Sequence, residues 1–94
     1  MNDKEIRKLL TDSVYSINDN IFELLETTNL EYYCMLEYYD TGNVYSITFL
    51  DISLFCSEND IYEDDEGNFI ITEEHLKNRI KNIVTNLNKL NLIK

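Results

Sequence analysis

Residues 30–49 read LEYYCMLEYYDTGNVYSITF, with apolar and polar side chains alternating on both sides of a turn-forming segment at residues 40–43. A period of two on each side of a short segment that contains Gly is typical of a β-hairpin. If Thr41 and Gly42 form the loop, one face of the hairpin is wholly apolar, and a slip of one residue would mix the two faces. The sequence therefore predicts strands at residues 30–39 and 44–49. This register sets Tyr38 against Tyr45, Leu36 against Ile47 and Cys34 against Phe49.

Amphipathic helices are expected on both sides of this hairpin. Residues 2–26 contain neither Gly nor Pro and place apolar side chains at intervals of three and four, which is typical of a helix. The poor helix formers at residues 16–20 predict a bend or a division there. Thr72, followed by Glu73 and Glu74, is a typical helix N-cap with acidic residues in the first turn. The helix that it begins has apolar side chains at Leu76, Ile80, Ile83, Leu87 and Leu90.

The residues between the hairpin and the last helix give weaker signals. Residues 50–54 alternate out of phase with the preceding strand, which indicates a bulge or a strand that changes faces. Residues 61–62 and 69–71 flank an acidic turn and resemble a second, short hairpin. The predicted fold is a single α+β domain over residues 1–94. Its three- to four-stranded antiparallel sheet is flanked by an N-terminal and a C-terminal amphipathic helix, in the order α-β-β-(β)-β-α.

Charge is distributed unevenly along the chain. The net charge of −10 divides into −3 for residues 1–30, −10 for residues 31–66, which contain no Lys or Arg, and +3 for residues 67–94. Closely spaced carboxylates can pair with the Lys and Arg side chains of a basic protein surface as phosphate groups do. Aromatic side chains with a polar end are favoured at protein interfaces. We therefore expect a partner-binding region in the centre of the chain. Its candidate residues are Glu58, Asp60, Tyr62, Glu63, Asp64, Asp65 and Glu66, together with Glu31, Tyr33, Glu37, Tyr39 and Asp40.

The leading hypothesis is a non-enzymatic, cytoplasmic binding or inhibitor protein that docks this acidic region on a basic protein surface. One form of it is a nucleic-acid mimic that occupies the phosphate-binding groove of a nucleic-acid-processing enzyme. In size and charge the chain is similar to phage inhibitors of such enzymes and to immunity proteins that cap basic nuclease toxins, without a shared motif. Direct binding to nucleic acid is disfavoured, because the net charge of −10 would repel a phosphate backbone.

Two other interpretations of the same region stay open. The protein could be an accessory subunit that forms a homodimer or larger oligomer through the Tyr-rich outer face of the hairpin, centred on Tyr33, Met35 and Tyr39. Alternatively, the acidic residues could serve only to keep a small domain in solution.

A third functional hypothesis is a weak calcium-responsive module. If Gly67 takes the position of the invariant glycine in a calcium loop, Asp64, Glu66 and Glu73 fall at ligand positions. The first ligand position is then Tyr62, which lacks the carboxylate that this position requires. The sequence therefore predicts no shaped metal site and no cofactor.

Catalysis is not expected from this sequence. His75 is the only histidine and lies in the first turn of the last predicted helix. The only glycines are Gly42 and Gly67, which are too few for a glycine-rich phosphate loop. Cys34 and Cys56 are expected to be reduced side chains in the core. No secretory signal is visible, and no apolar run approaches the roughly twenty residues that a membrane span needs.

Overall fold

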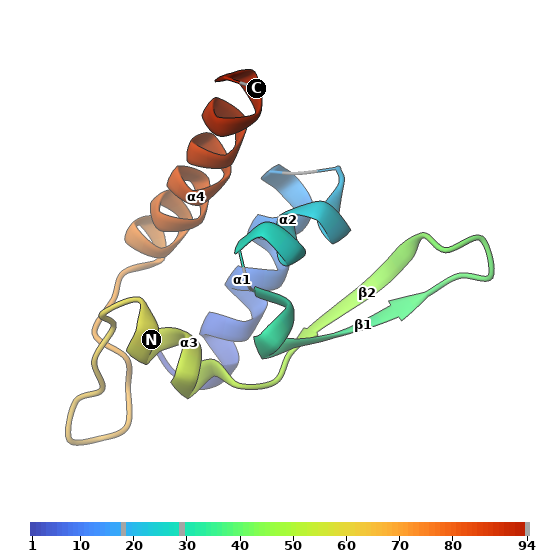
Figure 1. The fold of residues 1–94 in the computed structure, drawn as a ribbon. Helices are drawn as coiled ribbons and strands as arrows, with labels where there is room; N and C mark the ends of the chain where they lie inside the picture. Colours follow the sequence, from blue (N-terminus) through green and yellow to red (C-terminus); the bar gives the residue numbers. More distant parts are fainter. Residues whose placement is uncertain (18, 29, 94) are drawn as a thin grey trace.

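The computed structural model describes residues 1–17, 19–28 and 30–93, with side chains up to residue 86. Its elements follow the order α1 (Asp3–Ile17), α2 (Ile21–Thr28), the 3-10 helix η1 (Leu30–Tyr33), β1 (Cys34–Tyr38), β2 (Val44–Phe49), α3 (Ile52–Glu58) and α4 (Glu73–Ile93). The chain is therefore α+β, as predicted. Helix α1 lies at the centre of the fold, because it contacts α4, β2 and α3 (Figure 1).

The core joins the apolar stripes of the helices to one face of the hairpin. In α1, Ile6, Leu10 and Val14 are fully enclosed, as the predicted spacing requires. In α4, Leu76, Ile80 and Val84 are buried and Ile83 is half-buried. The predicted core positions Leu87 and Leu90 lie outside the described side chains. Burial of apolar surface on these stripes, at about 25 cal/mol per Å², is the main stabilising contribution to a fold of this kind.

The hairpin has most of the predicted register. Leu36 opposes Ile47 and Cys34 opposes Phe49, which confirms two of the predicted pairs. The third pair is wrong, since Tyr38 opposes Val44 and the register shifts between Glu37 and Tyr38.

The loop of the hairpin explains this shift. The Tyr39 N–H donates to the Asn43 carbonyl at 2.9 Å and the Gly42 N–H donates to the Tyr39 carbonyl at 2.9 Å, so the loop comprises residues 40–42. Gly42 has a φ of +88°, the left-handed conformation in which such three-residue loops commonly end before a bulge. The extra residue on the second strand is Tyr45, and the bulge carries its side chain away from the apolar face.

The three- to four-stranded sheet is not confirmed, because the sheet of the described residues has two strands. Residues 30–33, expected to begin the first strand, form the 3-10 helix η1. Residues 50–54, expected to form a bulge or a strand that changes faces, instead lead into α3, which begins at Ile52. The Asp51 carboxylate caps this helix by accepting from the Leu54 N–H at 2.9 Å, and its buried side chains Ile52, Phe55 and Cys56 have helical spacing.

The expected second hairpin is reduced to one isolated antiparallel bridge between Glu63 and Phe69. The Phe69 main chain is instead bonded to Met1, whose carbonyl accepts from the Phe69 N–H at 2.7 Å and whose amino group donates to the Phe69 carbonyl at 2.7 Å. Residues 59–71 therefore form an irregular segment that the N-terminal residue and the bridge hold in place.

The predicted division of the N-terminal helical region and the predicted start of the last helix are both confirmed. The N-terminal helical region divides into α1, which ends at Ile17, and α2, which begins at Ile21; Asn20 caps α2 by accepting from the Glu23 N–H at 3.2 Å. Thr72 caps α4, since its hydroxyl accepts from the His75 N–H at 3.2 Å. Short polar side chains at these positions satisfy main-chain donors that a helix leaves free at its start.

Candidate functional site

The acidic loop, residues 58–68, has a defined main-chain conformation. Asp64 organises it: its carboxylate accepts from the Glu66 N–H and from the Asn68 N–H, both at 2.9 Å. Its own N–H donates to the Asn68 carbonyl at 2.8 Å, and its carbonyl accepts from the Gly67 N–H at 3.2 Å. Gly67 has a φ of +83°, which a residue with a side chain rarely adopts. The loop is therefore a closed turn built around one carboxylate.

Three other carboxylates of the acidic loop are exposed and have no cationic partner among the described residues. Glu63, Asp65 and Glu66 are all exposed, and within the described part of the chain none of their carboxylates forms an ion pair or a hydrogen bond. The ion pairs between described residues join Arg7 to Asp3 and Lys77 to Glu73, both outside residues 31–66. The loop thus presents concentrated negative charge that no cation of the described chain neutralises.

Tyr33 and Glu58 lie where the acidic loop meets the body of the protein. Tyr33 is buried, its ring contacts Phe55 edge-on with centroids 5.8 Å apart, and its hydroxyl donates to the Glu58 carboxylate. Tyr33, a predicted partner-binding residue, therefore belongs to the core and joins η1 to α3. Sequence alternation placed it on the outer face of the hairpin because the 3-10 helix before β1 was not foreseen.

The outer face of the hairpin carries an aromatic and acidic cluster, formed by Met35, Glu37, Tyr39 and Tyr45. The Tyr39 and Tyr45 rings lie with centroids 4.7 Å apart, and the Tyr45 hydroxyl donates to the Glu37 carboxylate at 3.0 Å. This hydrogen bond, together with the negative charge of Glu37, raises the pKa of Tyr45. The Met35, Tyr39 and Tyr45 side chains are 48%, 61% and 46% exposed, respectively, so this hairpin face presents apolar surface to solvent. Asp40 lies exposed at the tip.

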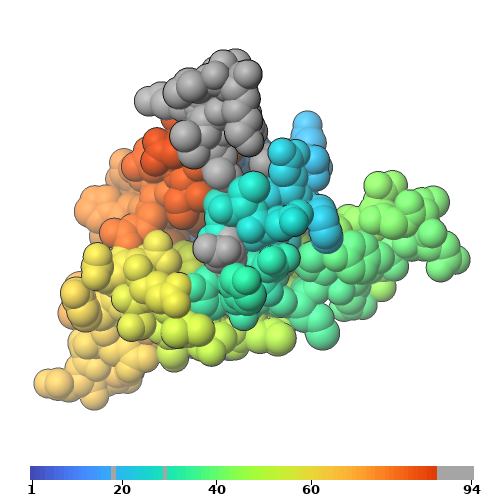
Figure 2. All heavy atoms as spheres, viewed as in Figure 1, coloured from blue at the N-terminus to red at the C-terminus, as the bar shows by residue number. Residues whose placement is uncertain are grey.

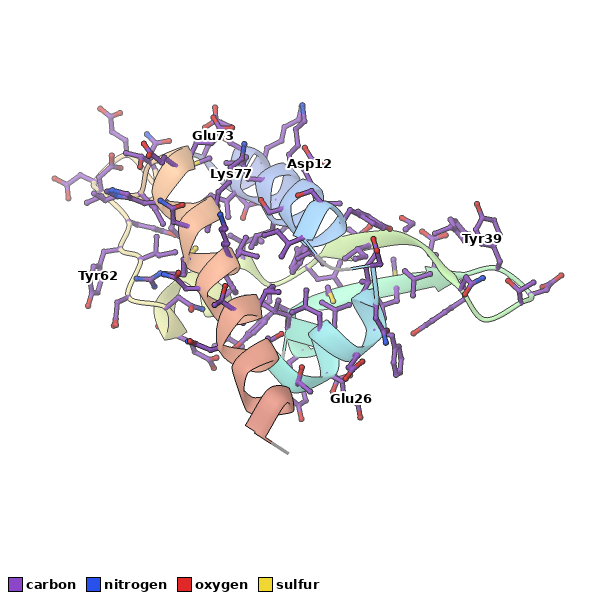
Figure 3. The ribbon with its side chains drawn as sticks, turned by 90° about the horizontal axis from the view of Figure 1, so that it is seen from above. Asp12, Glu26, Tyr39, Tyr62, Glu73 and Lys77 are labelled. Carbon is purple, nitrogen blue, oxygen red and sulfur yellow. The ribbon has the colours of Figure 1, made fainter. Side chains whose placement is uncertain are left out.

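The two surfaces lie at opposite ends of the protein. The hairpin extends from one side of the body and the acidic loop from the other (Figure 1, Figure 2). The labelled Tyr62 of the loop and Tyr39 of the hairpin are likewise far apart in the view from above (Figure 3). Glu31 is exposed on η1. The predicted single region is therefore two candidate surfaces: the acidic loop, with Asp60, Tyr62, Glu63, Asp64, Asp65 and Glu66, and the hairpin, with Glu37, Tyr39 and Asp40.

The described residues contain no group of three or more His, Cys, Asp or Glu side chains arranged to hold a metal ion. Asp64, which the calcium-loop alignment used as a ligand, is bonded to two main-chain N–H groups instead. Cys34 and Cys56 are free thiols, and burial raises the pKa of each from 9.0 to about 11. Both thiols are therefore protonated at neutral pH and poor nucleophiles.

Two features of potential functional interest were missed from the sequence. Tyr45 was assigned to the apolar face, and the bulge that moves it depends on a loop one residue longer than expected. The second feature is a groove of about 500 Å³ between α4 and residues 59–71. Its signal was present in the sequence as asparagines four residues apart, at Asn78, Asn82 and Asn86.

The fold and these surfaces define the class of protein: a small α+β fold in which a body of helices carries one projecting β-hairpin and an exposed acidic loop. Comparison with protein-family models, with curated proteins and with solved structures finds no match to this chain. Among the described residues, no helix combines the length and the apolar character that crossing a membrane would require.

Proposed function

We propose that the protein is a non-enzymatic, cytoplasmic binding protein whose acidic loop docks on a basic surface of a partner protein. The observation that carries this proposal is the set of exposed carboxylates of Glu63, Asp65 and Glu66, which have no cationic partner among the described residues. A partner that supplies Lys or Arg side chains would neutralise them, and long-range attraction would accelerate the encounter.

The closed turn around Asp64 supports this proposal further. A loop whose main chain is already fixed loses less conformational entropy on binding than a flexible acidic tail would. The partner class that fits exposed carboxylates so close together in the chain is a protein with a phosphate-binding groove, such as a nucleic-acid-processing enzyme. The acidic loop would inhibit it by occupying the groove.

The test uses two triple variants with the same change in charge. Glu63, Asp65 and Glu66 are changed to Lys in the first, which leaves the structural Asp64 intact. Asp19, Glu26 and Glu74 are changed to Lys in the control; these are exposed carboxylates outside residues 31–66. Wild type and both variants are immobilised and exposed to an extract of the source cells at low salt, and bound proteins are eluted with a salt gradient.

We expect wild type and the control to retain the same basic protein, and the loop variant to lose it. The recovered protein is then assayed for nucleic-acid processing with and without added wild type. Equal recovery by all three proteins would refute docking through the loop. Recovery without inhibition would retain the binding proposal and refute the nucleic-acid mimic.

The second candidate function is an accessory subunit that oligomerises through the hairpin, and the exposed Met35, Tyr39 and Tyr45 favour it. A two-stranded hairpin is only marginally stable by itself, so a partner on its open face would stabilise it. Sedimentation over a range of protein and salt concentrations separates the two functions. A dimer that persists at high salt and is lost on changing Met35 and Tyr39 to Ser supports the oligomer, whereas a monomer under all conditions excludes it.

A further inference from the structure

The groove between α4 and residues 59–71 combines three kinds of side chain. Apolar residues form part of its lining, and Ile70 among them is 68% exposed. Amides line it from α4, and Arg79 and His75 add the cationic and titratable groups on the same helix. Helix α4 forms one wall of the groove, and residues 59–61 with residues 70–71 form the other; in the view from above, Tyr62 lies on the same side of the protein as the start of α4 (Figure 3). One wall thus comes partly from the acidic segment and the other from α4, and the formally charged residues of the lining are Asp60 and Arg79.

Asn78, Asn82 and Asn86 form a ladder of amides along one wall of the groove. Residues four apart on a helix lie on the same face and about 6 Å apart along its axis. Each Asn side chain offers a carbonyl acceptor and an NH₂ donor, as a peptide group does. Within the described residues none of these three side chains forms a hydrogen bond. The groove therefore presents three free amides in a regular row.

The spacing of this ladder matches an extended polypeptide. A β-strand advances about 6.6–6.8 Å for every two residues, so every second peptide group of an extended chain can face one Asn side chain. The side chains between those peptide groups would alternate, and those directed into the groove would meet Ile70, Ile71 and Ile83. This arrangement suits a peptide that is recognised by its main chain and by a few apolar side chains.

Arg79 determines the charge of the occupant. It is half-buried, and the described residues give its guanidinium neither an ion pair nor a hydrogen bond. A partly desolvated cation without a partner favours an anionic group from a ligand, and a guanidinium pairs well with a carboxylate. Asp60 lines the groove from the wall opposite α4 and would repel a second acid there. The matching carboxylate is therefore expected on the α4 side.

We propose that this groove binds an extended segment of another protein, with its main chain on Asn78, Asn82 and Asn86 and an acidic side chain of the segment on Arg79. The groove shares Asp60 with the base of the acidic loop, whereas Glu63, Asp65 and Glu66 at the tip of the loop do not line it. The protein would thereby have two docking surfaces of opposite preference, one for a basic protein surface and one for an acidic, partly apolar strand.

The test begins with a displayed library of random twelve-residue peptides, selected against the full-length wild-type protein. We expect enriched peptides with an Asp or Glu flanked by apolar residues at two-residue spacing. Binding of these peptides is then measured to Asn82→Ala, to Arg79→Gln and to the matched control Lys81→Gln. Lys81 is an exposed cation on the same helix that does not line the groove. Far-UV circular dichroism establishes that each variant is folded.

The expected losses in affinity are about fivefold for Asn82→Ala and about tenfold or more for Arg79→Gln, with Lys81→Gln unchanged within about twofold. The ladder also predicts a period of two in the peptide. When alternate peptide nitrogens are N-methylated, one of the two alternating sets abolishes binding and the other leaves it intact. Failure to enrich any peptide, equal binding by all variants, or equal effects of both methylated sets would each overturn the proposal.

Discussion

Arg7 connects the first helix to the end of the hairpin, and its removal is expected to destabilise the protein more than the loss of any neighbouring surface cation. Its guanidinium donates to the Phe49 carbonyl and, at 2.8 Å, to the Leu50 carbonyl. A third donor, Nε, lies 2.5 Å from the Asp3 carboxylate one turn earlier in α1. One side chain thus satisfies the main-chain carbonyls of the last residue of β2 and of the residue that follows it, and keeps α1 against the strand.

The expected loss in the free energy of unfolding follows from the main-chain carbonyls that Arg7→Met would leave without a charged donor. Phe49 is 1% exposed, so its carbonyl would lose its charged donor with little access to water. A hydrogen bond to a charged group contributes about 1.5–3 kcal/mol, and an exposed ion pair contributes only about 0–1 kcal/mol. With the Leu50 carbonyl partly rehydrated, we expect the free energy of unfolding to fall by about 2–4 kcal/mol. A small domain with a total stability of roughly 5–10 kcal/mol would lose a large share of it.

The assay is urea unfolding of wild type, Arg7→Met and Lys8→Met, followed by circular dichroism. Lys8 is the matched control, because it is the next residue on α1, is exposed, and forms no ion pair or hydrogen bond among the described residues. Both substitutions remove one positive charge from a chain of net charge −10, so their difference isolates the contacts of Arg7. Equal unfolding free energies, within about 0.5 kcal/mol, would refute the connecting role of Arg7.

Three further substitutions or conditions test other parts of the structure. Asp64→Ala should lower the free energy of unfolding by about 1–2 kcal/mol and loosen the acidic loop, whereas Asp64→Asn should lower it less, because Asn keeps an acceptor for the two N–H groups. Hydrogen exchange of the Glu66 and Asn68 amides measures the difference between the two variants. Gly42→Ala should cost about 1–2 kcal/mol through its φ of +88° alone, because a Cβ there meets nothing within 4 Å; a cost near zero would contradict the loop geometry. Burial raises the pKa of Cys56 to about 11, so this thiol ionises at a lower pH in the unfolded protein than in the folded one. The free energy of unfolding should therefore fall by about 2 kcal/mol through this residue as pH rises from about 9 to 11, and urea titrations of Cys56→Ala should show a shallower decline.

The parts of the fold that sequence reasoning predicted are those determined by local patterns. The hairpin register around Leu36 and Ile47 follows from alternation, and the start of α4 follows from the Thr72 cap. Helix α3 was missed for a physical reason: a helix of seven residues has little intrinsic stability and depends on packing against the rest of the core. Its Asp51 cap and helical spacing are present in the sequence, but residues 50–54 also alternate, and that alternation predicts a strand.

The candidate site was predicted in composition but not in arrangement. The absence of Lys and Arg from residues 31–66 predicts a single acidic surface, whereas the fold places the hairpin and the acidic loop at opposite ends of the protein (Figure 1). Separation along a sequence does not determine separation in space when a helix such as α3 turns the chain between two segments. Tyr33 illustrates the same limit, since only the 3-10 turn before β1 directs its ring into the core.

The most direct test of the account is the salt dependence of the complex with the recovered partner, measured for wild type, for the loop variant with Glu63, Asp65 and Glu66 changed to Lys, and for the control variant. Exposed charges are screened over about 8 Å at 0.15 M salt and over about 30 Å at 0.01 M. If the acidic loop forms the contact, the affinity of wild type and of the control falls steeply as salt rises, and the loop variant shows no binding at any salt concentration. An affinity that does not change with salt, or a loop variant that binds as wild type does, would contradict the account.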